Sequence, residues 1–117
     1  MIRFRQIIAP FLVGMMGLCY STLSHSAQTI NLGMSSAFSG DNASMGEDFR
    51  AGAQAGFARF HDITGHSIQL TTLDDAYDPR QTAPNTRHLI TEEKVIALFG
   101  NLGTPTVAVS APIATES

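Results

Sequence analysis

The sequence predicts an α/β fold with three layers, in which helices cover both faces of a parallel sheet with a flavodoxin-like strand order. Short apolar segments typical of strands alternate with longer segments whose apolar residues recur every three or four positions. Glycine, serine, aspartate and proline separate these segments, as in loops. Regular alternation of strand and helix favours parallel strands joined by right-handed crossovers. The 117 residues suffice for one small domain.

Three strands and three helices are predicted in turn. The strands are expected at residues 30–34, 67–73 and 95–99, and the helices at 45–63, at 79–93 and from 104 onward. The third strand segment is apolar throughout, which is typical of a strand covered on both faces.

Capping residues define the first predicted helix. Asn42 or Ser44 can cap its start, and Gly65 ends it. Inside the helix, Gly52 and Gly56 are four positions apart and therefore share a face. We expect this face to form a flat strip against which the sheet packs closely.

Proline residues mark the starts of the other two helices. Asp78 before Pro79 makes a cap and first-turn pair, and Thr104 before Pro105 repeats the pattern. Pro84 conflicts with the interior of the second helix, because its ring clashes with the carbonyl group four residues back. We therefore expect the second helix to be kinked or to begin late.

Residues 1–27 have the pattern of a secretory signal peptide. Basic residues precede an apolar run at positions 7–18, and small polar residues follow. The run is shorter than the ~20 residues that span a bilayer, which favours a cleaved signal over a retained anchor. Small residues fit cleavage after Ser26 better than after Ala27, and Cys19 follows a bulky residue, which disfavours a lipoprotein signal. We expect export to the periplasm.

The composition of residues 28–117 excludes several classes of protein. Five Lys and Arg residues against ten Asp and Glu residues leave no basic footprint for nucleic acid. This part has no second apolar run that could cross a membrane and no cysteine for a disulfide or a thiolate metal site. Its three histidines lack metal-ligand spacing, and neither a nucleophile elbow nor a phosphate loop occurs. We expect no metal, no cofactor and no enzymatic activity.

Two adjacent carboxylates end the second predicted strand. Asp74 and Asp75 could form a metal site or an acid–base pair. More often such a pair is solvated loop charge that also caps a turn, and we favour that interpretation here.

The loops after the first and third strands form the predicted ligand site. In a flavodoxin-like sheet these loops, residues 35–44 and 100–106, face each other where the strand order reverses, and ligands bind there. A helix start offers unpaired N–H groups and a partial positive charge, so Thr104 could bind a carboxylate. Alternatively, Thr104 only caps its own helix. The candidate ligand-binding residues in this second loop are Asn101, Gly103, Thr104 and Thr106.

Three segments resemble those of a known family when they are taken together and in order. Residues 74–79 read DDAYDP, residues 85–90 read NTRHLI, and residues 99–106 read FGNLGTPT. Shorter similarities occur at residues 39–40 and 45–52. The chain resembles the type I periplasmic binding proteins of branched-chain amino acid ABC transporters across nearly all of residues 28–117.

The resemblance implies a two-lobed receptor that closes about a hinge on a small amino acid or a related carboxylate. It also implies a monomer that delivers this ligand to an ABC permease in the membrane. At the position of Thr104 the family has a hydroxyl residue that holds the ligand carboxylate. At the position of Met45 it often has a tyrosine that lines the pocket, so Met45 is a candidate ligand contact and indicates a different ligand.

Two departures from the family pattern lead to further expectations. Some members have a disulfide between the positions of Tyr77 and Gly103, and here we expect the tyrosine ring to fill the space of that bridge. Members are also much longer than 117 residues. We therefore interpret residues 28–117 as a fragment, a partial N-terminal lobe that by itself binds ligand weakly.

Two alternatives to a transport receptor stay open. Similar binding domains precede membrane signalling proteins, so the chain could belong to a sensor. A small secreted hydrolase or nucleotide-binding domain is the third hypothesis, but the sequence has no recognisable nucleophile or phosphate loop to support it.

Overall fold

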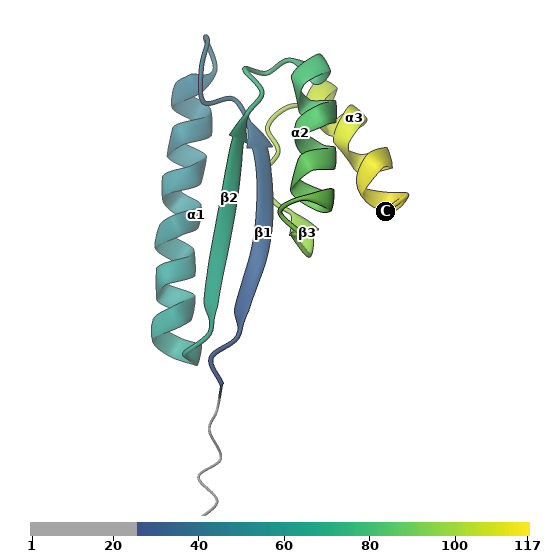
Figure 1. Ribbon diagram of the computed structural model, residues 1–117. Helices are drawn as coiled ribbons and strands as arrows, with labels where there is room; N and C mark the ends of the chain where they lie inside the picture. The colour runs from purple at the N-terminus through teal and green to yellow at the C-terminus, as the bar shows by residue number, and fades with distance from the viewer. Residues whose placement is uncertain (1–25) are drawn as a thin grey trace, which may run out of the picture.

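The computed structural model describes residues 26–117, so residues 1–25, with most of the predicted signal peptide, lie outside the described part. A parallel sheet stands between α1 on one face and α2 with α3 on the other (Figure 1). Within residues 26–117, no helix has both the length and the apolar character needed to cross a bilayer. In chain order the elements are β1 (Thr29–Ser36), α1 (Ala43–Thr64), β2 (Ser67–Asp74), α2 (Pro79–Thr91), β3 (Ala97–Leu98) and α3 (Thr104–Thr115).

The strand order of the sheet is β2–β1–β3, which confirms the predicted flavodoxin-like arrangement. All pairings are parallel, and β1 and β2 are in register over their full lengths, from Thr29 opposite Ser67 to Ser36 opposite Asp74. Because the three strands are parallel, the loops that follow them meet at one edge of the sheet. This edge is called the carboxyl edge below.

Strand β3 is shorter and more exposed than the sequence predicts. Only two residue pairs join it to β1, and backbone hydrogen bonds from Ile96 N to Asn31 O (2.9 Å) and from Phe99 N to Gly33 O (2.8 Å) extend the contact. Ile96 is 73% exposed, so the prediction that this segment is covered on both faces is wrong for the described residues.

Helix α1 ends as predicted. Gly65 adopts a left-handed conformation (φ 73°), and its N–H donates to His61 O at 2.8 Å. Asn42 occupies the N-cap position, but its side chain makes no capping hydrogen bond. The prediction that the sheet packs closely against Gly52 and Gly56 is wrong, because both glycines are exposed and face open space.

Gly46 makes the close approach that was expected of the other two glycines. It is buried near the start of α1, and a Cβ atom built there would overlap the carbonyl oxygen of Ala37. The absence of a side chain at Gly46 therefore lets α1 lie directly against the loop that follows β1.

Helix α2 begins as predicted at Asp78 and Pro79. The Asp78 carboxylate accepts a hydrogen bond from Arg80 N at 2.9 Å. The helix ends at Thr91, two residues before the expected position, and it contains Pro84. Since the helix already starts at Pro79, the late start considered for Pro84 is wrong.

The core lies on both faces of β1. On the α2 side, Gly33 has no side chain, so Leu89 and Val95 pack against the strand, and Leu89 is fully buried. On the α1 side, the Phe99 ring lies 5.8 Å from that of Phe49 and 5.5 Å from that of Phe57. Apolar side chains thus cover both faces of the sheet near β1, its central strand.

Candidate functional site

Three loops meet at the carboxyl edge of the sheet. They are residues 37–42 after β1, residues 75–78 after β2 and residues 99–103 after β3, and they lie at the arrowhead end of β1 and β2 in Figure 1. Strand β1 becomes steadily more buried toward this edge, and residues 33–37 are all buried. The loops therefore start from the best-packed part of the sheet.

Asp75 is a fully buried carboxylate that accepts hydrogen bonds from a strand, a turn and a helix. Its Oδ2 atom accepts hydrogen bonds from Ser35 Oγ at 2.8 Å and Thr82 Oγ1 at 2.9 Å, and its Oδ1 atom accepts one from Tyr77 N at 3.0 Å. The prediction of a solvated charge is wrong for Asp75, because three donors from different elements replace water around it. The sequence missed this cluster, in which the hydrogen-bonded residues Ser35 and Asp75 are 40 residues apart.

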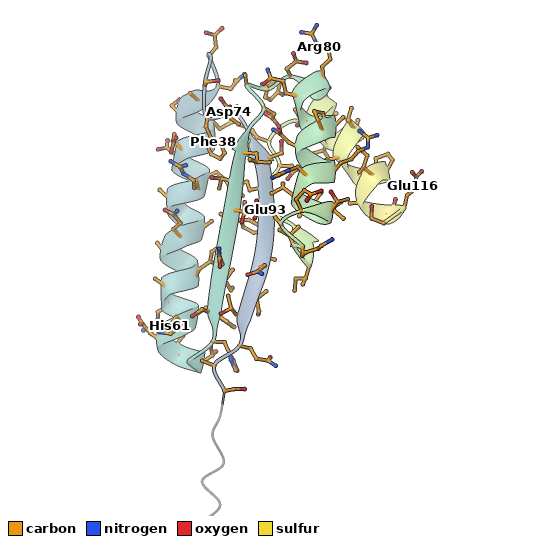
Figure 2. The ribbon with its side chains drawn as sticks, in the orientation of Figure 1. Phe38, His61, Asp74, Arg80, Glu93 and Glu116 are labelled. Atoms are coloured by element: carbon orange, nitrogen blue, oxygen red, sulfur yellow. The ribbon has the colours of Figure 1, made fainter. Side chains whose placement is uncertain are left out.

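Asp74 performs the turn role that the sequence predicts. Its Oδ1 atom accepts hydrogen bonds from Phe38 N at 2.8 Å and from Ala76 N at 2.9 Å. Partial burial raises the pKa of Asp74, but hydrogen bonds from the Ser39 side chain and from the backbone N–H groups of Phe38, Ala76 and Ser39 lower the pKa below its usual value. Asp74 thus ties the loop after β1 to the loop after β2 (Figure 2).

Phe38 is held from its other side by α1. The guanidinium group of Arg50 lies over the Phe38 ring, 4.8 Å from its centroid, and also pairs with Glu47. A cation over an aromatic face is attracted by the ring quadrupole. The loop after β1 is therefore fixed between α1 and Asp74.

The loop after β2 forms a tight turn with an unusual backbone. Asp78 N donates to Asp75 O at 2.7 Å, and the two central residues have positive φ angles, 49° at Ala76 and 64° at Tyr77. Turns with two positive φ angles normally have Asn and Gly at these positions. For other residues the conformation costs about 1–3 kcal/mol each and persists only where the surroundings enforce it.

The Tyr77 ring lies directly against Gly103. A Cβ atom built on Gly103 would lie 2.5 Å from Tyr77 Cζ and 2.6 Å from its hydroxyl oxygen. The prediction that the tyrosine ring fills the space beside Gly103 is confirmed. Gly103 itself has φ 97°, a conformation that L side chains rarely adopt.

Helix α3 begins at Thr104, with Gly103 in the N-cap position and Pro105 as the second helical residue. Among residues 26–117 no side chain caps the helix, so the alternative that Thr104 serves as its cap is wrong. Thr104 is exposed. The first turn therefore presents a hydroxyl group and the partial positive charge of a helix start at one surface.

The other candidate residues of this loop face the protein. Thr106 is fully buried, and its hydroxyl group donates to Gly103 O at 2.8 Å and to Leu102 O. Both polar atoms of the Asn101 side-chain amide are buried and have no hydrogen-bond partner among residues 26–117. Thr106 thus stabilises the α3 start from inside, and Asn101 retains unused donors and acceptors.

The candidate residues do not all line one hollow. Gly103 and Thr104 line an open depression of about 540 Å³ together with Val107 and Ala108. Asn101 lines a different one, of about 280 Å³, between α3 and the segment formed by the end of β3 and the loop after it. Met45, 56% exposed, lies near the start of α1. The structure thus places Gly103 and Thr104 in one depression and Asn101 in the other. Met45 lines neither of them.

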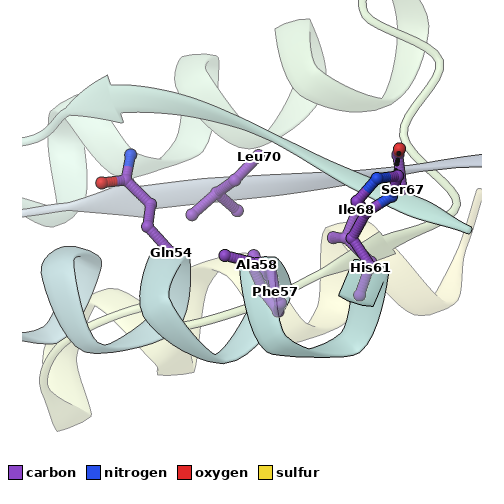
Figure 3. A pocket seen from close by; sticks show the side chains of 7 residues that line it. All are labelled: Gln54, Phe57, Ala58, His61, Ser67, Ile68 and Leu70. Atoms are coloured by element: carbon purple, nitrogen blue, oxygen red, sulfur yellow. Dashed lines mark hydrogen bonds between the residues drawn. The ribbon is translucent and has the colours of Figure 1, made fainter. Parts of the chain in front are cut away.

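A separate pocket of about 310 Å³ lies between α1 and β2, away from the carboxyl edge (Figure 3). One of its polar lining residues is His61, whose Nδ1 atom lies 3.2 Å from Ser67 Oγ and 3.2 Å from His66 O. Within residues 26–117 no three His, Cys, Asp or Glu side chains are grouped to hold a metal ion. The lining residues are Gln54, Phe57, Ala58, His61, Ser67, Ile68 and Leu70.

The strand order and the loops at the carboxyl edge define a doubly wound α/β lobe whose carboxyl edge is formed by helix starts and turns. The chain belongs to the periplasmic binding protein family, whose model matches residues 29–117. This membership confirms the resemblance and the fold predicted from the sequence.

Individual relatives agree with this membership. The chain is 30% identical over 102 residues to an amino acid binding protein of Pseudomonas aeruginosa, covering 84% of this chain and 26% of that protein. It is similar to the crystal structure of a possible leucine/isoleucine/valine-binding protein from Rhodopirellula baltica, with a TM-score of 0.71, 41% identity, and coverage of 77% of this chain and 25% of the other.

A third similarity is to the solute binding protein of an ABC transporter from Rhodopseudomonas palustris, in complex with 3,4-dihydroxybenzoic acid. The TM-score is 0.69 with 28% identity, covering 75% of this chain and 24% of the other. In each of these three comparisons the chain spans about a quarter of the relative's length.

Proposed function

We propose that residues 28–117 form the first part of the N-terminal lobe of an extracytoplasmic receptor for a small amino acid or a related carboxylate. The receptor passes its ligand to an ABC permease in the membrane and acts as a monomer without a cofactor. Family membership supports solute binding. Two of the relatives are named for amino acids and for leucine, isoleucine or valine, and the third is in complex with a dihydroxybenzoic acid; all of these compounds have a carboxyl group.

One observation carries the assignment of the ligand class. The first turn of α3 has no side-chain cap, and exposed Thr104 adds a hydroxyl group to the same end of the helix. A helix start with free N–H groups favours an anion, and a hydroxyl group supplies a further donor to a carboxylate. We infer that Thr104 binds the ligand carboxylate in the depression that it lines with Gly103.

The other candidates take supporting roles in this proposal. Buried Thr106 fixes the backbone of the α3 start through its hydrogen bond to Gly103 O. Asn101 contributes an amide that has no partner among the described residues. Met45, exposed at the start of α1, contacts the side chain of the ligand rather than its carboxylate. A flexible thioether there suits an apolar or aromatic group.

Binding is tested on the complete product of the gene that carries this sequence. Titration calorimetry with the amino acids and with hydroxybenzoates should identify a ligand. Thr104→Ala should then weaken its binding by about 1 to 3 kcal/mol, because a charge-assisted hydrogen bond is lost and the carboxylate has one donor fewer.

Two variants make this test specific. Thr104→Ser keeps the hydroxyl group and should bind nearly as well as the unmodified protein. Thr91→Ala removes an exposed hydroxyl group at the far end of α2 and should leave the affinity unchanged. Equal affinity of Thr104→Ala and the unmodified protein would contradict the role of Thr104.

Export is tested separately. The protein recovered from the periplasm should begin at Ala27 or Gln28, because residues 1–27 have the pattern of a cleaved signal peptide. N-terminal sequencing that finds Met1 in the membrane fraction would contradict this localisation.

A further inference from the structure

The turn after β2 contacts the end of β1 and the loop after β3. On one side, Asp75 accepts a hydrogen bond from Ser35 Oγ at the end of β1. On the other side, the Tyr77 ring occupies the space where a side chain of residue 103 would lie, directly before α3. The turn therefore connects the central strand of the sheet to the helix start at which Thr104 lies.

The backbone of this turn is enforced by carboxylates. Ala76 and Tyr77 both have positive φ angles, which are unfavourable for residues with a side chain. Asp74 Oδ1 accepts a hydrogen bond from Ala76 N at 2.9 Å, and Asp75 Oδ1 accepts one from Tyr77 N at 3.0 Å. Asp75 cannot move with the turn, because it is fully buried and its other oxygen is bonded to Ser35.

The turn places the Tyr77 ring against Gly103, and this close contact is possible because Gly103 has no side chain. Any Cβ atom at position 103 would collide with the ring. Gly103 is also the N-cap of α3, and its carbonyl oxygen accepts the first helical hydrogen bond, from Val107 N at 3.0 Å. Contact of the Tyr77 ring with Gly103 therefore restricts the backbone at the first turn of α3.

We propose that Tyr77 is a positioning residue for the carboxylate site. Its ring holds Gly103, and through Gly103 it holds the backbone N–H and the hydroxyl group of Thr104, while buried Asp75 sets the turn that presents the ring. The inference rests on the proposed function, in which Thr104 binds the ligand carboxylate. The contact involves the ring and a glycine, so the aromatic ring and not the phenol chemistry is required.

The first test needs no ligand and uses the complete gene product. Hydrogen–deuterium exchange in a peptide covering residues 99–110 should become about tenfold faster or more in Tyr77→Ala, because the α3 start opens more often. Tyr77→Phe keeps the ring and should exchange like the unmodified protein. Tyr77→Leu keeps part of the bulk, should show a smaller increase, and decides the question if Tyr77→Ala does not fold.

Asp75→Asn should loosen the same peptide. A carboxylate accepts through both oxygens, whereas an amide has one acceptor oxygen, so the Ser35 and Thr82 hydroxyl groups and Tyr77 N can no longer all donate to residue 75. The control peptide covers residues 60–72 and should not change in any variant. Unchanged exchange at residues 99–110, or an equal increase in both peptides, would overturn the proposal.

A second test measures coupling to Thr104, with L-leucine and 3,4-dihydroxybenzoate as probes. Tyr77→Ala should weaken binding of the probe about 5- to 150-fold, the same range as Thr104→Ala. If Tyr77 acts through Thr104, the double variant should bind no more than about twofold more weakly than the weaker single variant. Additive losses would overturn the proposal. Failure of the unmodified protein to bind either probe would count against the proposed function, and the exchange experiment then decides the inference on its own.

Discussion

The two ends of the sheet differ in how they use polar residues. At the carboxyl edge, Ser35 is fully buried and its hydroxyl group is hydrogen-bonded to Asp75 within a network that joins β1, the turn after β2 and α2. At the opposite end, the Ser67 hydroxyl group lies beside His61 in a partly exposed contact next to an open pocket. A buried and satisfied polar network specifies one arrangement, whereas an exposed contact exchanges readily with water. The hydrogen bonds that specify a single arrangement of side chains therefore lie at the carboxyl edge, where we propose that the solute binds.

Helix α1 shows the same difference along its length. Gly46, near the carboxyl edge, is buried against the Ala37 carbonyl group, whereas Gly56, further along, faces open space. We expect Gly46→Ala to destabilise the complete gene product by about 1–3 kcal/mol, since the added methyl group forces the backbone apart. Gly56→Ala should stabilise it by about 0.5–1 kcal/mol, because alanine favours the helix.

Urea unfolding followed by circular dichroism measures both changes. The two variants carry the same chemical change in the same helix, so only their surroundings differ. Two changes of the same sign would show that the carboxyl edge is not packed more tightly than the rest.

A second pair compares hydroxyl groups at the two ends. Ser35→Ala should cost about 1–3 kcal/mol, because it leaves a buried carboxylate short of a donor. Ser67→Ala should change the free energy of unfolding by about 0.5 kcal/mol or less. The same unfolding experiment serves for this pair, and a larger loss for Ser67→Ala would reverse the comparison.

The smallest predicted effect concerns acid stability. Asp74 has a lowered pKa in the folded protein, mainly because hydrogen bonds outweigh partial burial, so it binds a proton less readily when folded than when unfolded. Its contribution to stability is fully present above the unfolded pKa, near 4, and is lost as the pH falls below that value. Asp74→Asn should flatten the decline of the melting temperature between about pH 5 and pH 3.

The matched control for this prediction is Asp62→Asn, at an exposed position near the end of α1. Melting curves across this pH range should keep their slope in Asp62→Asn. An unchanged slope in Asp74→Asn would show that hydrogen bonds to Asp74 contribute little to the folded loop.

Local signals in the sequence sufficed where the structure depends on neighbouring residues. Gly65 closes α1 and Asp78 caps α2, because each acts within a few residues of its own position. The parallel sheet also followed from the alternation of strands and helices, since few topologies are compatible with it.

The sequence was insufficient where distant residues decide the outcome. It could not show which glycine of α1 faces the loop after β1, because helical spacing gives a face but not its neighbour. The aspartate pair looked like solvated charge, because the partner Ser35 lies 40 residues from Asp75. The contact of Tyr77 with Gly103 was predicted only because the resemblance indicated that these two positions are close.

The central claim is that the start of α3 binds the carboxyl group of a solute. A crystal structure of the complete gene product with its ligand tests it most directly. We expect a carboxylate oxygen at about 2.7–3.1 Å from the hydroxyl oxygen or the backbone nitrogen of Thr104. A ligand bound instead in the pocket between α1 and β2, or at the carboxyl edge with its carboxylate turned away from α3, would contradict the account.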